Sequence, residues 1–414
     1  MKYLFTLVII VSGFKTSAQE LTREQYRDDV EFFWNTVKSD YCYWDKKKTD
    51  WEAAKRIYLG EADTVSSRSS LICLLEKMFN EIYDAHASLN TNTPLSQRLV
   101  PSGADIWAEY INGKPLITDI RPGFGADKAG MLTGMEIVAV NDVPVAIAVK
   151  SFSPKTLTIN DREADGYALR SLLAGNHLVP RKITVLFGKQ VKDFYPDMPV
   201  NMFEKFSYNG LLESVVMDNN IGYIRINNRL WDNNLIQQFD SALDSLLHTK
   251  ALILDMRETP GGGNTTVARA MISRFIAREG FYQHHELTAE ERETGVKRSW
   301  KELVSPRGKL YKQPLYILVN HWTGSVGEGI VIGFDAFKRA VIVGDRMAGL
   351  NGANYSYQLP HSGIGFSFPV EKLFHMNGIP RELFSPSLIV QYKGGNGRSD
   401  AVIEAVIKRV NKEK

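Results

Sequence analysis

Two shortages in the sequence exclude whole classes of protein. Only two of the 414 residues are cysteines, too few for a disulfide framework, and no CxxC pair is present for zinc or redox chemistry. The zinc-protease helix motif HExxH is absent as well. The net charge of +3 is small, so the sequence lacks the excess of positive charge that is typical of nucleic-acid-binding proteins. The sequence therefore implies no metal, no organic cofactor and no nucleic-acid partner.

Long apolar runs are also missing, apart from a short one at the start of the chain. Lys2 precedes the apolar segment 3–11, and small residues at 16–18 offer a cleavage site before Gln19. The apolar segment is well short of the roughly 20 residues that a membrane-spanning helix needs. We predict a signal peptide over 1–18 and an exported protein, periplasmic or extracellular, without a membrane span. An exported protein reaches an oxidising compartment, where Cys42 and Cys73 could form a disulfide. The alternative is that both remain free thiols.

The length of 414 residues favours two or three domains, and the pattern of predicted helices and strands changes twice along the sequence. Residues 19–98 carry helical periodicity, for which Leu71, Leu75 and Met78 define one apolar face. Residues 99–200 consist of short strands and glycine turns. Residues 201–414 alternate strands with helices, which indicates a parallel sheet with helical crossovers. The predicted fold class is multidomain α/β, and the sequence leaves the oligomeric state open.

The middle segment contains a strand, a short helix, a glycine turn and a second strand. The first strand is expected at 114–120, and the pattern from 126 to 141 ends in an Asn-Asp turn. This arrangement resembles the PDZ domain found inside many secreted proteases. PDZ domains bind an extended peptide by adding it as a strand to a sheet edge. The alternative is a spacer domain that binds no ligand.

A serine follows one of the buried strands in the last segment. The apolar strand 315–319 runs through a short turn to Ser325, after which a helix begins. A hydroxyl in that position can act as a nucleophile, and the N–H of Val326 can stabilise an oxyanion. The alternative is that Ser325 only caps the helix. The hydrolase motif GxSxG is not met, because position 323 is Thr.

A glycine-rich loop follows another strand of the same segment. The strand 251–257 leads through Glu258, Thr259 and Pro260 into three consecutive glycines at 261–263. Such a loop lets backbone N–H groups approach a ligand closely, as in an oxyanion hole or a phosphate site. Phosphate binding is disfavoured because no Gly-Lys-Ser/Thr follows. A tight turn before a helix remains the alternative.

The two loops together resemble a known family. An Asp-x-Arg-x-x-Pro-Gly-Gly loop followed by Thr-x-Ser-x-x-Glu is similar to the C-terminal processing (tail-specific) proteases and the tricorn-core-like serine peptidases. The resemblance implies a crotonase-like catalytic domain with Ser325 as nucleophile. It also implies that Val326 and Gly261, or with less weight Gly262, donate the oxyanion N–H groups.

The sequence departs from that family at two positions. Thr259 stands where members usually carry Asn, and Leu350 stands where processing proteases carry the lysine of a Ser–Lys dyad. Leucine cannot accept a proton, and serine needs an acceptor because it is a poor nucleophile at its free pKa. The base must therefore come from elsewhere.

The tricorn-like branch implies a different base. The segment 83–86 ends in an Asp-x-His motif that resembles that branch, which makes His86 the candidate base and Asp84 a supporting residue. A Gly-x-Pro-x-Glu stretch suggests Glu382 as the carboxylate that orients the imidazole. His321, four residues before the serine, is the rival base.

Two further charged residues belong to the candidate site. Glu328 lies one turn along the helix from Ser325, where it can orient the active-site loop, contact substrate, or form a structural pair with Arg257. The sequence as a whole predicts an exported serine endopeptidase acting on peptides or unfolded proteins. The alternative, motivated by Leu350 and Thr259, is a catalytically inactive peptide-binding pseudo-protease.

Overall fold

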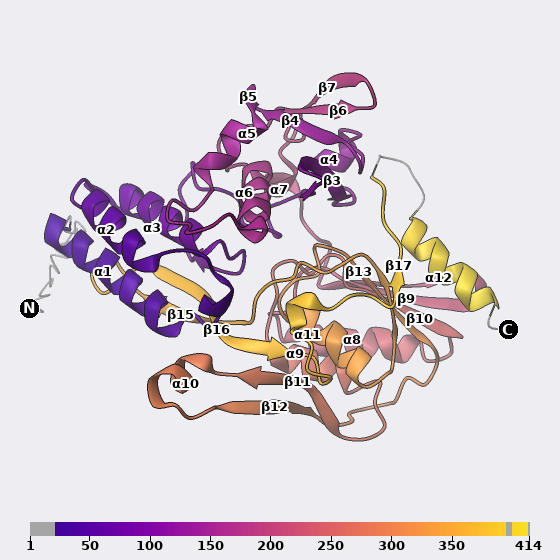
Figure 1. The fold of residues 1–414 in the computed structure, drawn as a ribbon. Helices are drawn as coiled ribbons and strands as arrows, with labels where there is room; N and C mark the ends of the chain where they lie inside the picture. Colours follow the sequence, from indigo (N-terminus) through magenta and orange to yellow (C-terminus); the bar gives the residue numbers. More distant parts are fainter. Residues whose placement is uncertain (1–20, 395–399, 413–414) are drawn as a thin grey trace, which may run out of the picture.

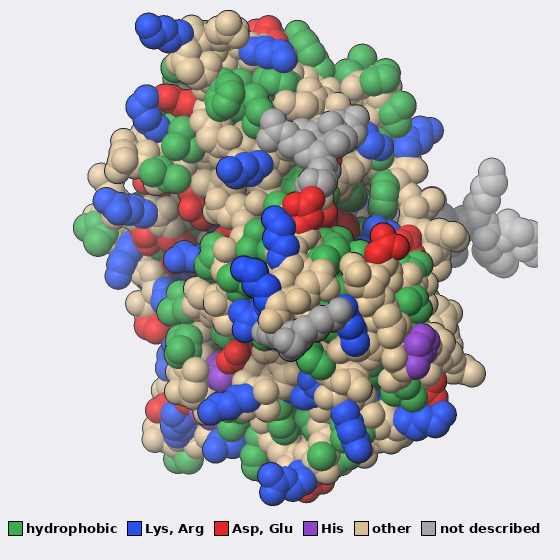
Figure 2. All heavy atoms as spheres, turned by 90° about the vertical axis from the view of Figure 1, so that its right-hand side faces the viewer, with side chains coloured by type: hydrophobic (Ala, Val, Ile, Leu, Met, Phe, Trp, Pro, Cys, Tyr) green, Lys and Arg blue, Asp and Glu red, His purple; other side chains and the backbone are tan. Residues whose placement is uncertain are grey.

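The computed structural model describes residues 21–394 and 400–412, so the predicted signal peptide over 1–18 lies outside the described residues. The described chain is a multidomain α/β protein with helices and three sheets (Figure 1). Within this part of the chain, no helix is both long and apolar enough to cross a membrane. Figure 2 shows Lys, Arg and hydrophobic side chains intermixed over the face that carries the C-terminal helix.

Three helices form the start of the described chain: α1 (Arg23–Asp40), α2 (Trp51–Ala62) and α3 (Arg68–Ile82). Capping side chains fix where all three begin, because Thr22, Asp50 and Ser67 each accept a backbone N–H of the first turn. The apolar faces of the helices bury Phe33, Leu75 and Met78 in one core. Cys42 and Cys73 are both free thiols, which settles the question of their pairing.

An antiparallel sheet carries this helical core on one face. Its strands are β1 (Ser88–Leu89), β11 (Gly280–Glu286), β12 (Ser299–Val304), β15 (Ala353–Gln358) and β16 (Gly365–Phe374). The central strand is β16, which pairs with β1, β11 and β15. Phe366, Phe368 and Val370 point from β16 into the helical core, while Glu371 and Leu373 point to the opposite face. The N-terminal helices are thereby joined to strands more than 250 residues away in the sequence (Figure 1).

A second sheet lies in the middle segment. It consists of β2 (Ile106–Ile111), β3 (Lys114–Ile120), β4 (Glu136–Val140), β5 (Val143–Pro144), β6 (Ile183–Phe187) and β7 (Gln190–Phe194), with helices α4 (Gly125–Lys128), α5 (Val145–Ala148) and α6 (Arg162–Ala174). The strand expected at 114–120 is present as β3. Asn141 and Asp142 both have positive φ, 48° and 65°, in the turn between β4 and β5. The PDZ-like character of this segment stays a prediction.

The third sheet positions the candidate site. Its order is β17 (Leu388–Ile389), β14 (Val341–Gly344), β13 (Leu315–Val319), β10 (Ala251–Asp255), β9 (Ile221–Ile226) and β8 (Leu212–Met217). Helices α8 (Asn234–Ser245), α9 (Thr265–Ile272) and α11 (Val326–Ala336) cover one face, and α12 (Ala401–Lys412) covers the other. Because β10 and β13 are parallel neighbours, the loops after them meet at one sheet edge. Those loops are the glycine loop and the serine turn.

Candidate active site

Ser325 occupies a strained turn between β13 and α11. Its backbone angles are φ 53° and ψ −116°, a conformation that non-glycine residues rarely adopt. Its N–H donates to Glu328 Oε2 at 2.8 Å, while Gly349 N–H donates to Glu328 Oε1 at 2.9 Å. The strain costs about 1–3 kcal/mol and persists only because the surroundings hold it, as at functional sites. Glu328 therefore holds the turn at Ser325 beside the loop at Gly349, and its role in a reaction stays a prediction.

His86 reaches Ser325 from the end of the N-terminal helical segment. Its Nε2 lies 3.1 Å from Ser325 Oγ, and its Nδ1 lies 2.6 Å from the carbonyl oxygen of Asn351. Because a carbonyl only accepts, Nδ1 carries the proton and Nε2 presents its lone pair to the hydroxyl. This is the tautomer that a general base needs. The structure thus brings together the predicted nucleophile and the predicted base.

Asp84 supports the imidazole indirectly. Its Oδ1 accepts the N–H of His86 at 2.9 Å. Its Oδ2 accepts the Tyr41 hydroxyl at 2.7 Å and the Asn351 side-chain amide at 2.9 Å. The buried carboxylate therefore fixes both the backbone of the base and the residue whose carbonyl orients the ring. Its supporting role in a reaction stays a prediction.

The prediction that Glu382 orients His86 is corrected by the structure. Glu382 Oε1 accepts from Lys46 Nζ at 2.5 Å, and the group on His86 Nδ1 is instead the Asn351 carbonyl. The neighbouring Arg381 turns toward the same loop and donates through Nη2 to the carbonyls of Leu350 and Gly352, at 3.0 and 2.7 Å. The late Gly-x-Pro-x-Glu stretch therefore acts on the loop that holds the imidazole, through the arginine.

The predicted structural pair between Glu328 and Arg257 does not form. Arg257 Nη2 lies 2.6 Å from Asp255 Oδ2 and 2.8 Å from Asp400 Oδ2, so it ties the sheet edge to the segment before α12. Glu328 is fully buried beside Arg381, whose Nη2 is 3.9 Å away. Burial raises the pKa of Glu328 to about 7, against the lowering effect of the Arg381 charge.

Of the predicted oxyanion donors, Gly261 is engaged elsewhere. Its N–H donates to Asn228 Oδ1 at 2.8 Å. Gly262 lies against the nucleophile: it has φ 65°, and a Cβ there would come within 2.6 Å of Ser325 Cβ. The same Cβ would lie 3.7 Å from the nitrogen of Val326, the first residue of α11. The N–H of Gly262 also has an acceptor, the Thr259 carbonyl, but at 3.4 Å this bond is much longer than the 2.8 Å bond of Gly261. The proximity to Ser325 and this longer bond favour Gly262 over Gly261 as the partner of Val326.

Thr259, the departure from the family in the glycine loop, links the two loops of the site. Its N–H donates to the Trp322 carbonyl at 3.2 Å, and its carbonyl accepts the N–H of Gly324 at 3.3 Å. Its hydroxyl donates to the Met256 carbonyl at 2.8 Å. The threonine is fully buried, and the loop stays in contact with the serine turn despite the missing asparagine.

His321 points away from the serine, toward the middle sheet. Its Nδ1 lies 2.9 Å from Asp119 Oδ2, and its ring stacks on Trp107 with centroids 4.5 Å apart. Burial raises the pKa of Asp119. Ligand-type atoms of Asp119, His321 and Asp345 lie within 4.8 Å of one another, but Asp119 and Asp345 already bind His321 and Gln391. The group is a hydrogen-bonded contact between segments.

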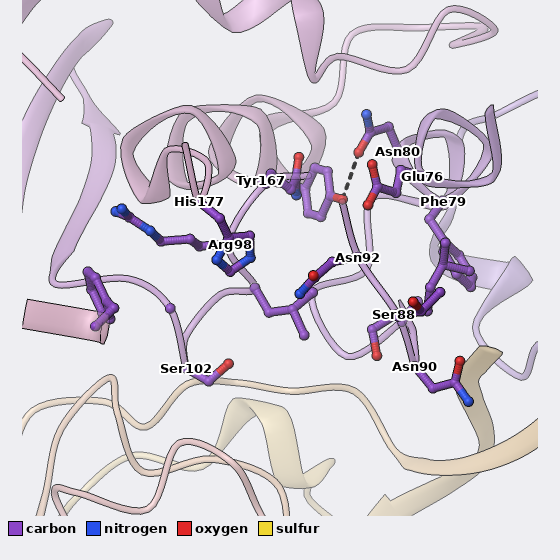
Figure 3. Close-up of a pocket in the computed structure, with 17 residues that line it drawn as sticks. Glu76, Phe79, Asn80, Ser88, Asn90, Asn92, Arg98, Ser102, Tyr167 and His177 are labelled. Atoms are coloured by element: carbon purple, nitrogen blue, oxygen red, sulfur yellow. Dashed lines mark hydrogen bonds between the residues drawn. The ribbon is translucent and has the colours of Figure 1, made fainter. Parts of the chain in front are cut away.

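Several cavities border the segment that contains His86. The catalytic cavity has a volume of about 500 Å³ and contains Ser325, His86 and Val326 at one end and residues of β11, β12, β15 and β16 along its walls. A second cavity of about 460 Å³ begins at Ala87 and lies between the helical segment and the middle segment (Figure 3). Sequence reasoning did not identify the second cavity, since none of its residues forms a motif.

Comparison with known proteins identifies similar families and folds. Residues 220–382 match the family model of Peptidase family S41, and residues 22–80 match the Tricorn protease C1 domain. Mature CPAF is similar with a TM-score of 0.59 and 15% identity, covering 94% of this chain and 96% of that one. The photosystem II D1 C-terminal processing protease gives a TM-score of 0.52 and 18% identity, covering 90% and 94%. The predicted family resemblance and multidomain α/β fold are confirmed.

Replacing Asp84 with asparagine is expected to lower kcat about tenfold or more with a smaller change in KM. The substitution places an NH₂ group either against the His86 N–H or against the Tyr41 hydroxyl and the Asn351 amide, all of which are donors. The Asn351 carbonyl and the imidazole therefore lose part of their support. The free energy of unfolding should fall by about 1–3 kcal/mol. Steady-state kinetics and urea unfolding measure both effects, with the exposed Asp63→Asn as control. An unchanged kcat would contradict the supporting role.

Proposed function

We propose that this relative of the tail-specific S41 proteases is an exported serine endopeptidase that cleaves peptides or unfolded proteins. The observation that carries the proposal is the 3.1 Å contact between Ser325 Oγ and the unprotonated Nε2 of His86. The family match supports peptidase activity, and the contact supplies the serine mechanism. The division into 19–98, 99–200 and 201–414, and a PDZ-like peptide binder in the middle, remain part of the proposal.

In the proposed mechanism, Ser325 Oγ attacks the carbonyl carbon of the scissile bond while its proton passes to His86 Nε2. The N–H groups of Val326 and Gly262 stabilise the tetrahedral oxyanion. His86 then gives the proton to the leaving amine, the C–N bond breaks, and an acyl-enzyme remains. Water, deprotonated by the same nitrogen, releases the acid and restores the serine. Asn351 holds the ring in one tautomer throughout.

The inactive peptide-binding alternative is not favoured. It rests on Leu350 in the place of the lysine and on Thr259 in the glycine loop. His86 lies within reach of the same serine as a proton acceptor, and Thr259 keeps the glycine loop in contact with the serine turn. The buried Leu350 instead packs beside Gly324, next to the nucleophile. Incubation of the purified protein with a denatured protein, followed by mass spectrometry of the products, separates the two functions. New peptides support a peptidase, and binding without cleavage supports the alternative.

The pH dependence of the reaction should reflect the environment of the base. Burial, and then the charge of Arg381, lower the pKa of His86 from 6.5 to about 4. The neutral imidazole is the active form, so kcat/KM should stay high down to about pH 5 and fall about tenfold per unit below pH 4. A loss of kcat/KM already at pH 6–7 would contradict this prediction if Glu328→Gln shows the same loss. If the loss disappears in Glu328→Gln, it belongs to the Glu328 carboxyl, whose pKa is raised to about 7.

A further inference from the structure

The strand that follows the base has one unpaired edge. β1 begins two residues after His86 and, among the described strands, pairs only with β16. Ser88 lies opposite Ser367, and the N–H of Asn90 donates to the Gly365 carbonyl at 2.9 Å. In an antiparallel pair, bonded residues alternate. The N–H and carbonyl of Leu89 therefore point away from β16, toward the free edge.

That free edge borders the second cavity. Ala87, Ser88, Leu89 and Asn90 line one side of its volume of about 460 Å³. The other sides come from α3, from α6 and from residues 97–103. Figure 3 shows Asn80, Tyr167 and Arg98 arranged around the space, with the Tyr167 hydroxyl donating to Asn80 Oδ1. The cavity thus offers room for a chain lying beside β1 and for at least one of its side chains.

The edge begins two residues after His86, which lines the catalytic cavity. Strand alternation places Ser88 and Ser367 on the face of the sheet that carries Glu371 and Leu373, and those two residues line the catalytic cavity. Leu89 is three residues from His86, so their Cα atoms are at most about 11 Å apart. Consider an extended peptide whose scissile bond lies at Ser325. The substrate residue that lies beside β1 is then three or four positions from the scissile bond.

We infer that the free edge of β1 binds the backbone of the substrate by strand addition, three or four residues from the scissile bond. The substrate N–H donates to the Leu89 carbonyl, and the Leu89 N–H donates to a substrate carbonyl. Backbone pairing accepts many sequences, because it reads the extended conformation and not the side chain. The inference rests on the proposed peptidase function and adds a binding site to it.

The unaltered protein can test this with synthetic peptides. A peptide with at least five residues on each side of the cleaved bond is compared with copies that carry one N-methyl group at successive backbone positions. Each methyl removes one donor. We expect kcat/KM to fall roughly three- to tenfold at a single position three or four residues from the bond, where one hydrogen bond is lost. Equal values at all positions beyond the two nearest the bond would overturn the inference.

A variant tests the other hydrogen bond. Leu89→Pro removes the outward N–H without touching the ladder to β16, and proline is tolerated on such an edge. Leu89→Ala removes the same side chain but keeps the N–H, so it is the matched control. For each variant, kcat/KM of a long peptide is divided by kcat/KM of a short one. This ratio should be roughly three- to tenfold lower in Leu89→Pro than in Leu89→Ala. Equal ratios would overturn the inference.

The two levels of the proposal fail in different ways. If no peptide is cleaved by the unaltered protein, the peptidase function is wrong. If peptides are cleaved but neither the N-methyl series nor the ratio of long to short peptides responds, only strand addition at β1 is wrong. Should Leu89→Pro fail to fold, the N-methyl series still decides.

Discussion

Replacing Ser325 with alanine is expected to abolish peptide cleavage, lowering kcat by about 10⁴-fold or more. The variant keeps the oxyanion donors and the substrate-binding surface but has no oxygen to form the acyl-enzyme. The fold should survive, because the removed hydroxyl contributes only a contact to His86 at 3.1 Å and the acceptor of the capping box at the start of α11. The free energy of unfolding should fall by about 0.5–2 kcal/mol, the usual cost of losing an N-cap side chain.

The comparison needs a matched serine variant. Ser214 lies on the exposed edge strand β8, which β9 separates from β10, so Ser214→Ala should retain full activity. Both variants are measured for turnover of a fluorogenic peptide and for thermal unfolding. Residual activity of Ser325→Ala within tenfold of the parent protein would show that another group is the nucleophile.

His86→Ala should have the second-largest effect, a loss of about 10²–10⁴-fold in kcat, the usual contribution of a general base. The hydroxyl would have no acceptor, because Leu350 occupies the place of the family's lysine and Glu328 binds backbone N–H groups. KM should change much less, since the substrate contacts remain. Steady-state kinetics on one peptide separate the two parameters.

His321→Ala is the matched control for that experiment. This ring is buried and binds Asp119 and Trp107, so its loss should lower the free energy of unfolding by about 1–3 kcal/mol. Its effect on kcat should stay within about tenfold. The reverse order of the two effects on kcat would make His321 the base and would leave the 3.1 Å contact without a function.

Much of the site was predictable because its residues carry local signals. A buried strand that runs into a serine and a helix predicts the place of Ser325, and the second strand with its glycine loop predicts the neighbouring turn. Parallel pairing of β10 and β13 then brings both loops to one edge. His86 was reachable only through the resemblance, since a lone histidine at the end of a helix has no distinctive pattern.

The remaining contacts could not be predicted, for a physical reason. The group that orients His86 is the backbone carbonyl of Asn351, and every residue has such a carbonyl. Gly261 binds Asn228, which is 33 positions away in the sequence, and Glu382 binds Lys46, which is 336 positions away. Such pairs are fixed by the tertiary packing of separate elements, which one sequence does not reveal.

The central claim is that a neutral imidazole from the N-terminal segment activates the alcohol at position 325. The most direct test is the second-order rate at which a fluorophosphonate labels the protein, with the modified residue identified by mass spectrometry. We predict labelling at Ser325 that slows by about 100-fold or more in His86→Ala. Equal labelling rates in the two proteins, or a label on another residue, would contradict the claim.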